Sequence, residues 1–199
     1  MSTNSSDRQG ISILKIGGSV ITDKNTEENI AKHDEIDRIA KEISGFKGKL
    51  IIVHGAGSFG HPQAKKYQIT DKFNAKGSII THNSVKVLNQ LFTDYLVDNN
   101  VNAVSLHPMN NTVSENGRIL EMFLDNINIM LDNNITPVLH GDVVMDTVKG
   151  TSVISGDQIV PYLAAQMEAS RIGVGSIEEG VLDEKGNTLK LINHENFEN

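Results

Sequence analysis

The chain has 199 residues, of which 38% are apolar and 5% aromatic, and its formal net charge at pH 7 is −7. An acidic chain with few aromatic side chains is unsuited to nucleic-acid binding, and the absence of cysteine excludes disulfides and thiolate metal sites. The length suits one large α/β domain or two small ones. No apolar run is long enough to span a membrane and the polar start lacks a signal peptide, so we expect a soluble cytoplasmic protein.

Apolar spacing and turn residues predict alternating strands and helices in the first half of the chain. After a frayed lead-in over residues 1–10, the predicted elements are a strand over 11–16, a helix over 34–44, a strand over 50–53, a helix beginning near 61, a loop over 68–77 and a helix over 78–99. Asp34 is the expected N-cap of the helix over 34–44. Val87 is expected on the buried stripe of the long helix.

The second half of the chain continues the alternation and adds hairpins. In order, we expect a strand over 101–108, a hairpin over 112–120 with its turn at Asn116-Gly117, a helix over 120–133, a strand over 136–142, a hairpin over 143–154, a helix over 155–169, a strand over 171–175 and a hairpin over 180–191. Another helix is expected to begin after residue 191. This alternation predicts an α/β fold with a mainly parallel sheet covered by helices on both faces.

Two glycine-rich turns follow directly after predicted strands. The first is Gly17-Gly18-Ser19, and the second runs from Gly55 to His61 after a buried β-branched run. Glycines let the backbone approach a ligand, and successive N–H groups in such a turn form a nest for phosphate oxygens. A helix beginning near His61 would add its dipole at the same spot. The alternative is an ordinary strand–turn–helix whose glycines serve only to turn the chain.

Other polar candidates lie near the same ends of the predicted strands. In an open α/β sheet, ligands bind beyond the carboxyl ends of the strands, where His107 and Gly141-Asp142 are found. Lys15 interrupts an apolar strand, either as a solvated edge lysine or as an ammonium directed at phosphate. Lys24 is expected on a loop close to the same rim. His82, within the long helix, is more typical of packing than of ligand binding.

The glycine loops match neither of two common nucleotide-binding motifs, and they favour a site for phosphoryl transfer. The chain has no GxxxxGK[ST] sequence, so it has no P-loop. Residues 55–60 have G-x-G-x-x-G spacing, but no clear acidic residue follows at the position that reads ribose in a dinucleotide fold. Phosphoryl transfer requires mainly positioning and charge neutralisation, which lysines and loop N–H groups supply.

Several motifs resemble the amino acid kinase superfamily, and in particular its isopentenyl phosphate kinase family. The resemblance is carried by Ile13–Ser19, Ile21–Lys24, His54–Pro62, Val104–Pro108, Pro137–Asp142 and Ile154–Val160. These segments follow one another in the family's order, from about residue 11 to residue 175.

The resemblance implies a three-layer αβα sandwich over residues 11–199, with an acceptor-binding part over about 11–155 and an incomplete nucleotide-binding part over about 156–199. It implies transfer of the γ-phosphoryl group of ATP to isopentenyl phosphate, which gives isopentenyl diphosphate for isoprenoid biosynthesis in the archaeal-type mevalonate pathway. ATP and Mg²⁺ are the implied cofactors, because Mg²⁺ commonly accompanies ATP phosphates. The implied assembly is a homodimer.

The resemblance also assigns roles to individual residues. On the nucleotide side, Lys15, Gly17, Gly18, Ser19 and Gly57 would contact ATP, and Lys24 would stabilise the transferring group.

On the acceptor side, Gly55, Ala56 and Gly156 would contact the substrate, and His61 would donate a hydrogen bond to its phosphate. Asp142 and Asp157 are further candidates that organise the lysines or Mg²⁺, or else serve only as a turn residue and a helix N-cap.

The chain departs from the family pattern near its end. Where the family usually has Thr-Asp-Val-Asp-Gly, this chain has Ser176-Ile177-Glu178-Glu179-Gly180, so Ser176 is a further candidate but an acidic position has become Ile177. A later Asp-Val-Thr-Gly-Gly segment is not found before Asn199. Two alternatives therefore stay open: a related kinase with another phosphate or phosphonate acceptor such as fosfomycin, and a non-catalytic binding module of the same fold.

Overall fold

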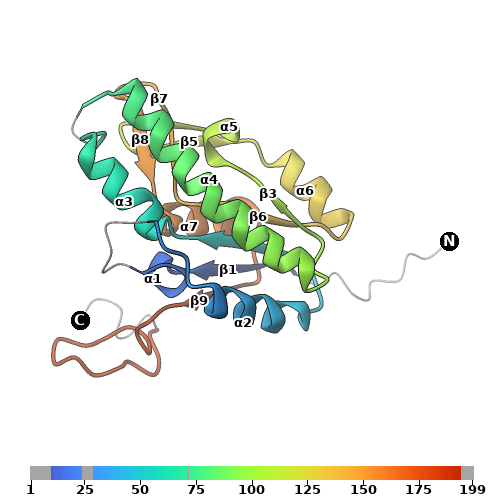
Figure 1. The fold of residues 1–199 in the computed structure, drawn as a ribbon. Coiled ribbons are helices and arrows are strands. Elements are labelled where there is room, and N and C mark those ends of the chain that lie inside the picture. Colours follow the sequence, from blue (N-terminus) through green and yellow to red (C-terminus); the bar gives the residue numbers. More distant parts are fainter. Residues whose placement is uncertain (1–9, 24–28, 71, 194–199) are drawn as a thin grey trace.

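The computed structural model describes residues 10–23, 29–70 and 72–193 (Figure 1). Residues 1–9 of the predicted lead-in, Lys24 and the end of the chain after residue 193 lie outside the described residues.

A parallel sheet forms the centre of the molecule. Within the described residues it has five strands, which are β1 (Ser12–Ile16), β2 (Leu50–His54), β3 (Ala103–Ser105), β6 (Thr136–His140) and β9 (Arg171–Gly175). Their order across the sheet is β3-β6-β2-β1-β9, and every neighbouring pair is parallel. The neighbouring strands β1 and β2 therefore end beside each other.

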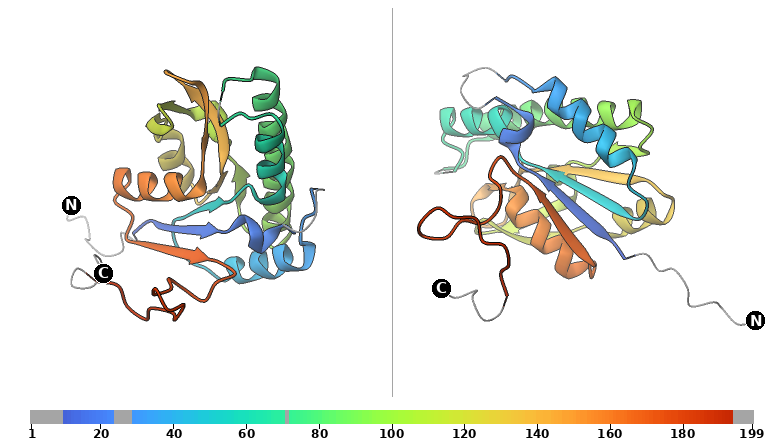
Figure 2. Two further views of the ribbon diagram at one scale, coloured as in Figure 1. Left: turned by 90° about the vertical axis from the view of Figure 1, so that its left-hand side faces the viewer. Right: turned by 90° about the horizontal axis from the view of Figure 1, so that it is seen from below.

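Helices cover both faces of this sheet, which confirms the predicted αβα sandwich (Figure 2). One face carries α1 (Gly18–Ile21), α2 (His33–Ser44), α3 (Gly57–Lys66) and α4 (Ala75–Asp98), and the other carries α6 (Asp125–Asp132) and α7 (Gly156–Gln166). The continuously apolar run Leu50–Val53 in strand β2 is explained by its position between the two layers of helices. Ile51 and Val53 pack toward α7, whereas Leu50 and Ile52 pack toward α2 and α4, so both faces of the strand are buried.

A smaller sheet stands above the carboxyl ends of β2 and β6 (Figure 1). Its strands are β4 (Thr112–Glu115), β5 (Arg118–Met122), β7 (Asp142–Asp146) and β8 (Gly150–Ile154), in the order β5-β4-β7-β8. A short helix, α5 (Pro108–Asn111), leads from β3 into it. Because β7 begins two residues after β6 ends, the small sheet stands as a wall beside the carboxyl ends of the main sheet's strands.

Asp146 joins the two hairpins of the small sheet. Its buried carboxylate accepts hydrogen bonds from both of the turns and from strands β4 and β8; the donors are the hydroxyls of Ser114 and Ser152 and the backbone N–H groups of Asn116, Gly117, Val148 and Lys149. Burial raises the pKa of this carboxyl, but the hydrogen bonds outweigh it and hold the pKa well below its usual range.

Three predictions about helices are wrong in detail. Helix α2 begins at His33 with Lys32 at the N-cap, so Asp34 lies in the first turn, where a carboxylate still favours the helix dipole. Helix α3 begins at Gly57 rather than near His61. The first-turn N–H groups of a helix have no helical partner, so the glycines at this end interrupt no helical hydrogen bonds. Val87 is 62% exposed; Leu88, expected on the same stripe, is buried, and so is Phe92, which was not expected there.

The predicted helix over 120–133 is also wrong at its start. Asn116 and Gly117 have φ values of +49° and +84°, as a tight hairpin turn requires. This turn pairs Arg118–Met122 with β4, and α6 begins only at Asp125. Farther on, the hairpin predicted over 180–191 consists of one isolated bridge, between Leu182 and Thr188, in the described residues.

Among the described residues, no helix combines the length and the apolar character that crossing a membrane would need.

Candidate active site

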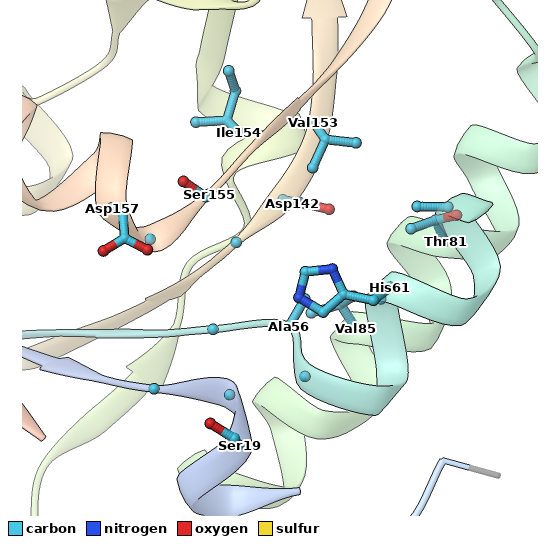
Figure 3. Close-up of a pocket in the computed structure, with 18 of the residues that line it drawn as sticks. Ser19, Ala56, His61, Thr81, Val85, Asp142, Val153, Ile154, Ser155 and Asp157 are labelled. Atoms are coloured by element: carbon cyan, nitrogen blue, oxygen red, sulfur yellow. The ribbon is translucent and has the colours of Figure 1, made fainter. Parts of the chain in front are cut away.

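A pocket of about 300 Å³ lies at the carboxyl ends of β1, β2 and β6. Its residues come from the two glycine loops, from α3 and α4, from the small sheet and from the start of α7 (Figure 3); they are Lys15, Gly17, Gly18, Ser19, Gly55, Ala56, Gly57, Gly60, His61, Ala64, Thr81, Val85, Gly141, Asp142, Val143, Val153, Ile154, Ser155, Gly156, Asp157 and Ser176. Every residue to which the family resemblance assigns a role lines this pocket, except Lys24, which lies outside the described residues.

The floor of the pocket is made by the two glycine loops, which touch through their backbones. A Cβ atom on Gly55 would lie 2.6 Å from the nitrogen of Gly18, and a Cβ on Gly18 would overlap the backbone of Gly57. Real Cβ contacts do not occur at such distances, so these positions require glycine. Gly57 also has a φ of +52°, in the region that favours glycine.

Thr22 fastens the two loops together, a role that the sequence analysis did not assign. Its buried hydroxyl donates to the Gly18 carbonyl over 2.7 Å and accepts from the Ser58 backbone N–H over 3.1 Å. The first of these loops, Gly17–Ser19, is also held by Lys32, whose ammonium donates to the Ser19 carbonyl over 3.0 Å. A signal for Thr22 existed in the sequence, since it lies in the motif Ile21–Lys24.

Lys15 projects from the end of β1 into the pocket and is paired with a carboxylate. Its ammonium lies 2.6 Å from Asp157 in the first turn of α7, and the two side chains are 18% and 75% exposed. The predicted association of Asp157 with a lysine is therefore present in the structure. Because Asp157 is largely exposed, the pair is easily opened when an anion competes for the lysine.

Helix N-termini add positive electrostatic potential to the pocket. The longer helices α3 and α7 both begin in it, at Gly57 and Gly156, so their first-turn N–H groups lie at its edge. His61 projects from α3 into the space between Asp142 and Ser19 (Figure 3). The arrangement brings together an ammonium, an imidazole and free N–H groups, which suits phosphate groups.

One side of the pocket is apolar. The lining includes Val85 from α4 and Val153 and Ile154 from β8, and of these three Val153 is exposed while the other two are buried (Figure 3). A ligand that fits the whole pocket therefore combines an anionic head with an apolar part.

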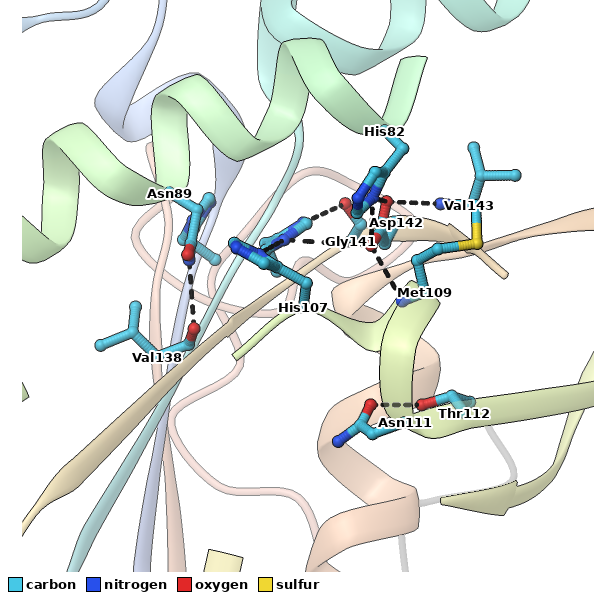
Figure 4. Close-up of polar contacts among 12 residues, drawn as sticks. His82, Asn89, His107, Met109, Asn111, Thr112, Val138, Gly141, Asp142 and Val143 are labelled. Atoms are coloured by element: carbon cyan, nitrogen blue, oxygen red, sulfur yellow. Dashed lines mark hydrogen bonds and ion pairs between the residues drawn. The ribbon is translucent and has the colours of Figure 1, made fainter. Parts of the chain in front are cut away.

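Asp142 lines the pocket as expected but has different partners, and His107 lies outside the pocket. Asp142 is buried and accepts from His82 Nδ1 over 2.9 Å and from the Met109 backbone N–H over 3.1 Å, so it contacts a histidine rather than a lysine (Figure 4). His107 does not line the pocket; it lies behind it, with Nδ1 2.9 Å from Nε2 of His140. Within the described residues, no group of three or more His, Cys, Asp and Glu side chains could hold a metal ion.

Comparison with known proteins agrees with this geometry. The model of the amino acid kinase family matches residues 10–199. Isopentenyl phosphate kinase from Methanocaldococcus jannaschii is 37% identical over 92% of this chain and 78% of its own length. The enzyme of that name from Methanothermobacter thermautotrophicus is 38% identical over 85% of this chain and 68% of its own length.

A solved isopentenyl phosphate kinase structure superposes with a TM-score of 0.82 at 38% identity, covering 86% of this chain and 73% of that one. The chain therefore belongs to the amino acid kinase family, and within that family it groups with the isopentenyl phosphate kinases.

Proposed function

We propose that this chain transfers the γ-phosphoryl group of ATP to isopentenyl phosphate and so forms isopentenyl diphosphate and ADP. The observation that carries the proposal is the pocket at the ends of β1, β2 and β6, in which a phosphate-binding floor adjoins an apolar wall. Relatives that are 37% and 38% identical to this chain over the aligned residues bear the name of this activity. A small acceptor with a phosphate head and a short hydrocarbon tail is the ligand that this combination suits.

In the proposed reaction, the two loops hold the two reactants against each other. Gly17–Ser19 and Lys15 bind the ATP phosphates, with Gly57 beside them. Gly55, Ala56 and Gly156 bind the acceptor phosphate, and His61 donates to it. An acceptor oxygen attacks the γ-phosphorus, the bond to the β–γ bridging oxygen breaks, and ADP leaves. The residues contribute positioning and charge neutralisation rather than covalent chemistry.

Lys15 is suited to stabilise the negative charge that develops between the reactants, because it lies near the end of β1, beside the two glycine loops. Asp157 would hold the ammonium in place until ATP competes for it. Lys24 has a proposed role on the transferring group, and Ser176 a proposed place at the nucleotide rim.

Mg²⁺ would enter with ATP. Mg²⁺ is usually held by one or two carboxylates together with substrate phosphates rather than by a cage of protein ligands. The described residues fit this mode, since they contain no cluster of three ligands and Asp157 presents one exposed carboxylate at the rim. The ion would neutralise phosphate charge there.

The remaining parts of the proposal rest on the family resemblance. They are an acceptor-binding part over about 11–155, a nucleotide-binding part that begins at about 156, a homodimer and a cytoplasmic location.

A coupled ADP-release assay with Mg-ATP tests the proposal. The acceptors are isopentenyl phosphate, inorganic phosphate, fosfomycin and carbamate, and the two proteins are the wild type and His61→Ala. We expect turnover with isopentenyl phosphate, with kcat/KM lowered about 10²-fold or more in His61→Ala, because a donor to the acceptor phosphate is lost. Preference for fosfomycin would replace the proposed acceptor, and binding of isopentenyl phosphate without turnover would identify a non-catalytic module.

A further inference from the structure

Two buried histidines occupy matching places beneath the pocket. His54 and His140 are the last residues of the neighbouring strands β2 and β6, they are paired in register, and both are fully buried. Their rings stack with centroids 5.7 Å apart. Each histidine is followed by a glycine of the pocket, Gly55 or Gly141. Neither ring lines the pocket, so neither can touch a substrate there.

Each imidazole donates a hydrogen bond to the carbonyl of the glycine that follows it. Nδ1 of His54 lies 2.9 Å from the Gly55 oxygen, and Nδ1 of His140 lies 3.0 Å from the Gly141 oxygen. A carbonyl oxygen can only accept, so Nδ1 carries the proton in both rings.

The second nitrogen of each ring also has a partner. The Asn89 amide donates to Nε2 of His54 over 3.0 Å, and its orientation is set by a second bond from the same nitrogen to the Val138 carbonyl (Figure 4). Nε2 of His140 accepts from Nδ1 of His107 over 2.9 Å.

The Asp142 carboxylate is an acceptor that could compete for Nε2 of His140. It lies 3.9 Å away, beyond hydrogen-bond range. Both rings are thus held as the Nδ1–H tautomer by contacts on each side.

The rings are also neutral over the ordinary working range of pH. Burial, with the nearby His140 ring, lowers the pKa of His54 to about 3, and burial lowers the pKa of His140 despite the opposing Asp142 carboxylate. Burial and His140 lower the pKa of His107 to about 4. A neutral imidazole has one proton, so each ring donates only through Nδ1.

The carbonyl bond determines which way the next peptide N–H points. In a trans peptide the C=O and N–H groups point in opposite directions. With the Gly55 carbonyl held by His54 beneath the pocket, the N–H of Ala56 is directed to the pocket side. Gly141 lies against this nitrogen: a Cβ on Gly141 would be 3.7 Å from the Ala56 nitrogen and 3.5 Å from the Gly156 nitrogen.

We propose that His54 and His140 are positioning residues for the acceptor phosphate. The Nδ1–H group of His54 holds the Gly55 carbonyl away from the pocket, which turns the Ala56 N–H toward the acceptor phosphate. The Nδ1–H group of His140 holds the Gly141 carbonyl away from the pocket, which keeps Gly141 close to the Ala56 nitrogen. Asn89 and His107 keep the proton on the required nitrogen. This inference deepens the proposed function and rests on it for the identity of the acceptor.

The first test measures the tautomers directly. Long-range ¹H–¹⁵N correlation spectra of the full chain at pH 7 should show protonated Nδ1 and unprotonated Nε2 for His54 and His140. Exposed His33, on α2, is the control for the assignment of the signals. Protonation of His54 or His140 on Nε2 alone would overturn the inference, whatever the activity of the protein.

The second test compares His54→Asn with His54→Leu in the ADP-release assay. The Asn side chain places an N–H near the position of Nδ1, whereas Leu cannot donate. We expect His54→Leu to lower kcat/KM for isopentenyl phosphate about tenfold or more, mostly through the acceptor KM, and His54→Asn to recover to within about threefold of wild type. His33→Asn should behave as wild type.

Equal kcat/KM values for the Asn and Leu variants would overturn the inference, provided that thermal unfolding shows both to be folded. If His54→Leu does not fold, the same comparison is made at His140. If the wild-type chain has no turnover, the proposed function fails, and calorimetric binding of isopentenyl phosphate to the same variants decides the positioning role by the same tenfold difference.

Discussion

The contact between the two glycine loops predicts a large effect from a single methyl group. In Gly55→Ala, the new Cβ would lie 2.6 Å from the Gly18 nitrogen, whereas ordinary contacts begin at 3.4 Å, so the loops must separate by about 0.8 Å. The neighbouring atom is backbone and cannot turn aside as a side chain would. A displacement of about 1 Å between reacting groups lowers rates about 10²-fold, which corresponds to about 2.7 kcal/mol of transition-state stabilisation.

The assay for Gly55→Ala is ADP release with Mg-ATP and isopentenyl phosphate, with kcat and both KM values measured. Gly45→Ala is the matched control, because Gly45 has a φ of −77° at the end of α2 and its Cβ would make an ordinary 3.5 Å contact with Glu42. Thermal unfolding of both variants separates loss of fold from loss of geometry. A folded Gly55→Ala protein with kcat/KM within about threefold of wild type would refute the argument that the loop spacing controls the reaction.

Three further variants probe the site and the small sheet. Lys15→Met should lower kcat about 10²-fold or more without unfolding the chain, since an ammonium facing phosphate is lost; a retained kcat in the same assay would exclude the proposed role. Thr22→Val should lower the free energy of unfolding by about 1–3 kcal/mol in urea titrations, because the buried Ser58 N–H loses its partner, whereas the Gly18 carbonyl keeps the Thr22 backbone N–H; an unchanged midpoint would show that the contact between the loops does not need the Thr22 hydroxyl. Asp146→Asn should cost about 2–4 kcal/mol at pH 7. Because the folded-state pKa of Asp146 is lowered, its stabilisation is complete above the usual carboxyl pKa of about 4 and is lost as the pH falls toward the folded value, so wild type and variant should converge in acid. A pH-independent difference would contradict the assignment.

Local patterns in the sequence were sufficient to predict the sheet and both glycine loops. The β-branched runs before Gly17 and Gly55 identify strands, and the glycines that follow identify turns with close backbone contact. The parallel arrangement followed from the alternation of elements, and with it the meeting of the loops at one edge. The family resemblance supplied the acceptor, which composition and spacing could not identify.

Contacts between residues far apart in the sequence could not be predicted in the same way. The pair between Lys15 and Asp157 joins residues that are 142 positions apart and depends on α7 beginning beside the end of β1. His107 was expected at the site because it follows a strand, but β3 is the edge strand of the sheet, and its end lies behind the pocket. Helix periodicity over 120–133 was misleading because hairpin pairing determined the conformation of the first three residues.

The backbone floor and the side-chain wall of the pocket have different capacities for evolutionary change. The floor consists of main-chain atoms that every sequence supplies, and glycine is required there, so mutation at Gly18 or Gly55 can only obstruct it. The wall consists of side chains, among them the exposed Val153, whose size and polarity change with one substitution. New acceptor tails can therefore be accommodated one mutation at a time while the phosphate chemistry stays intact, which makes this scaffold a favourable starting point for altered acceptor range.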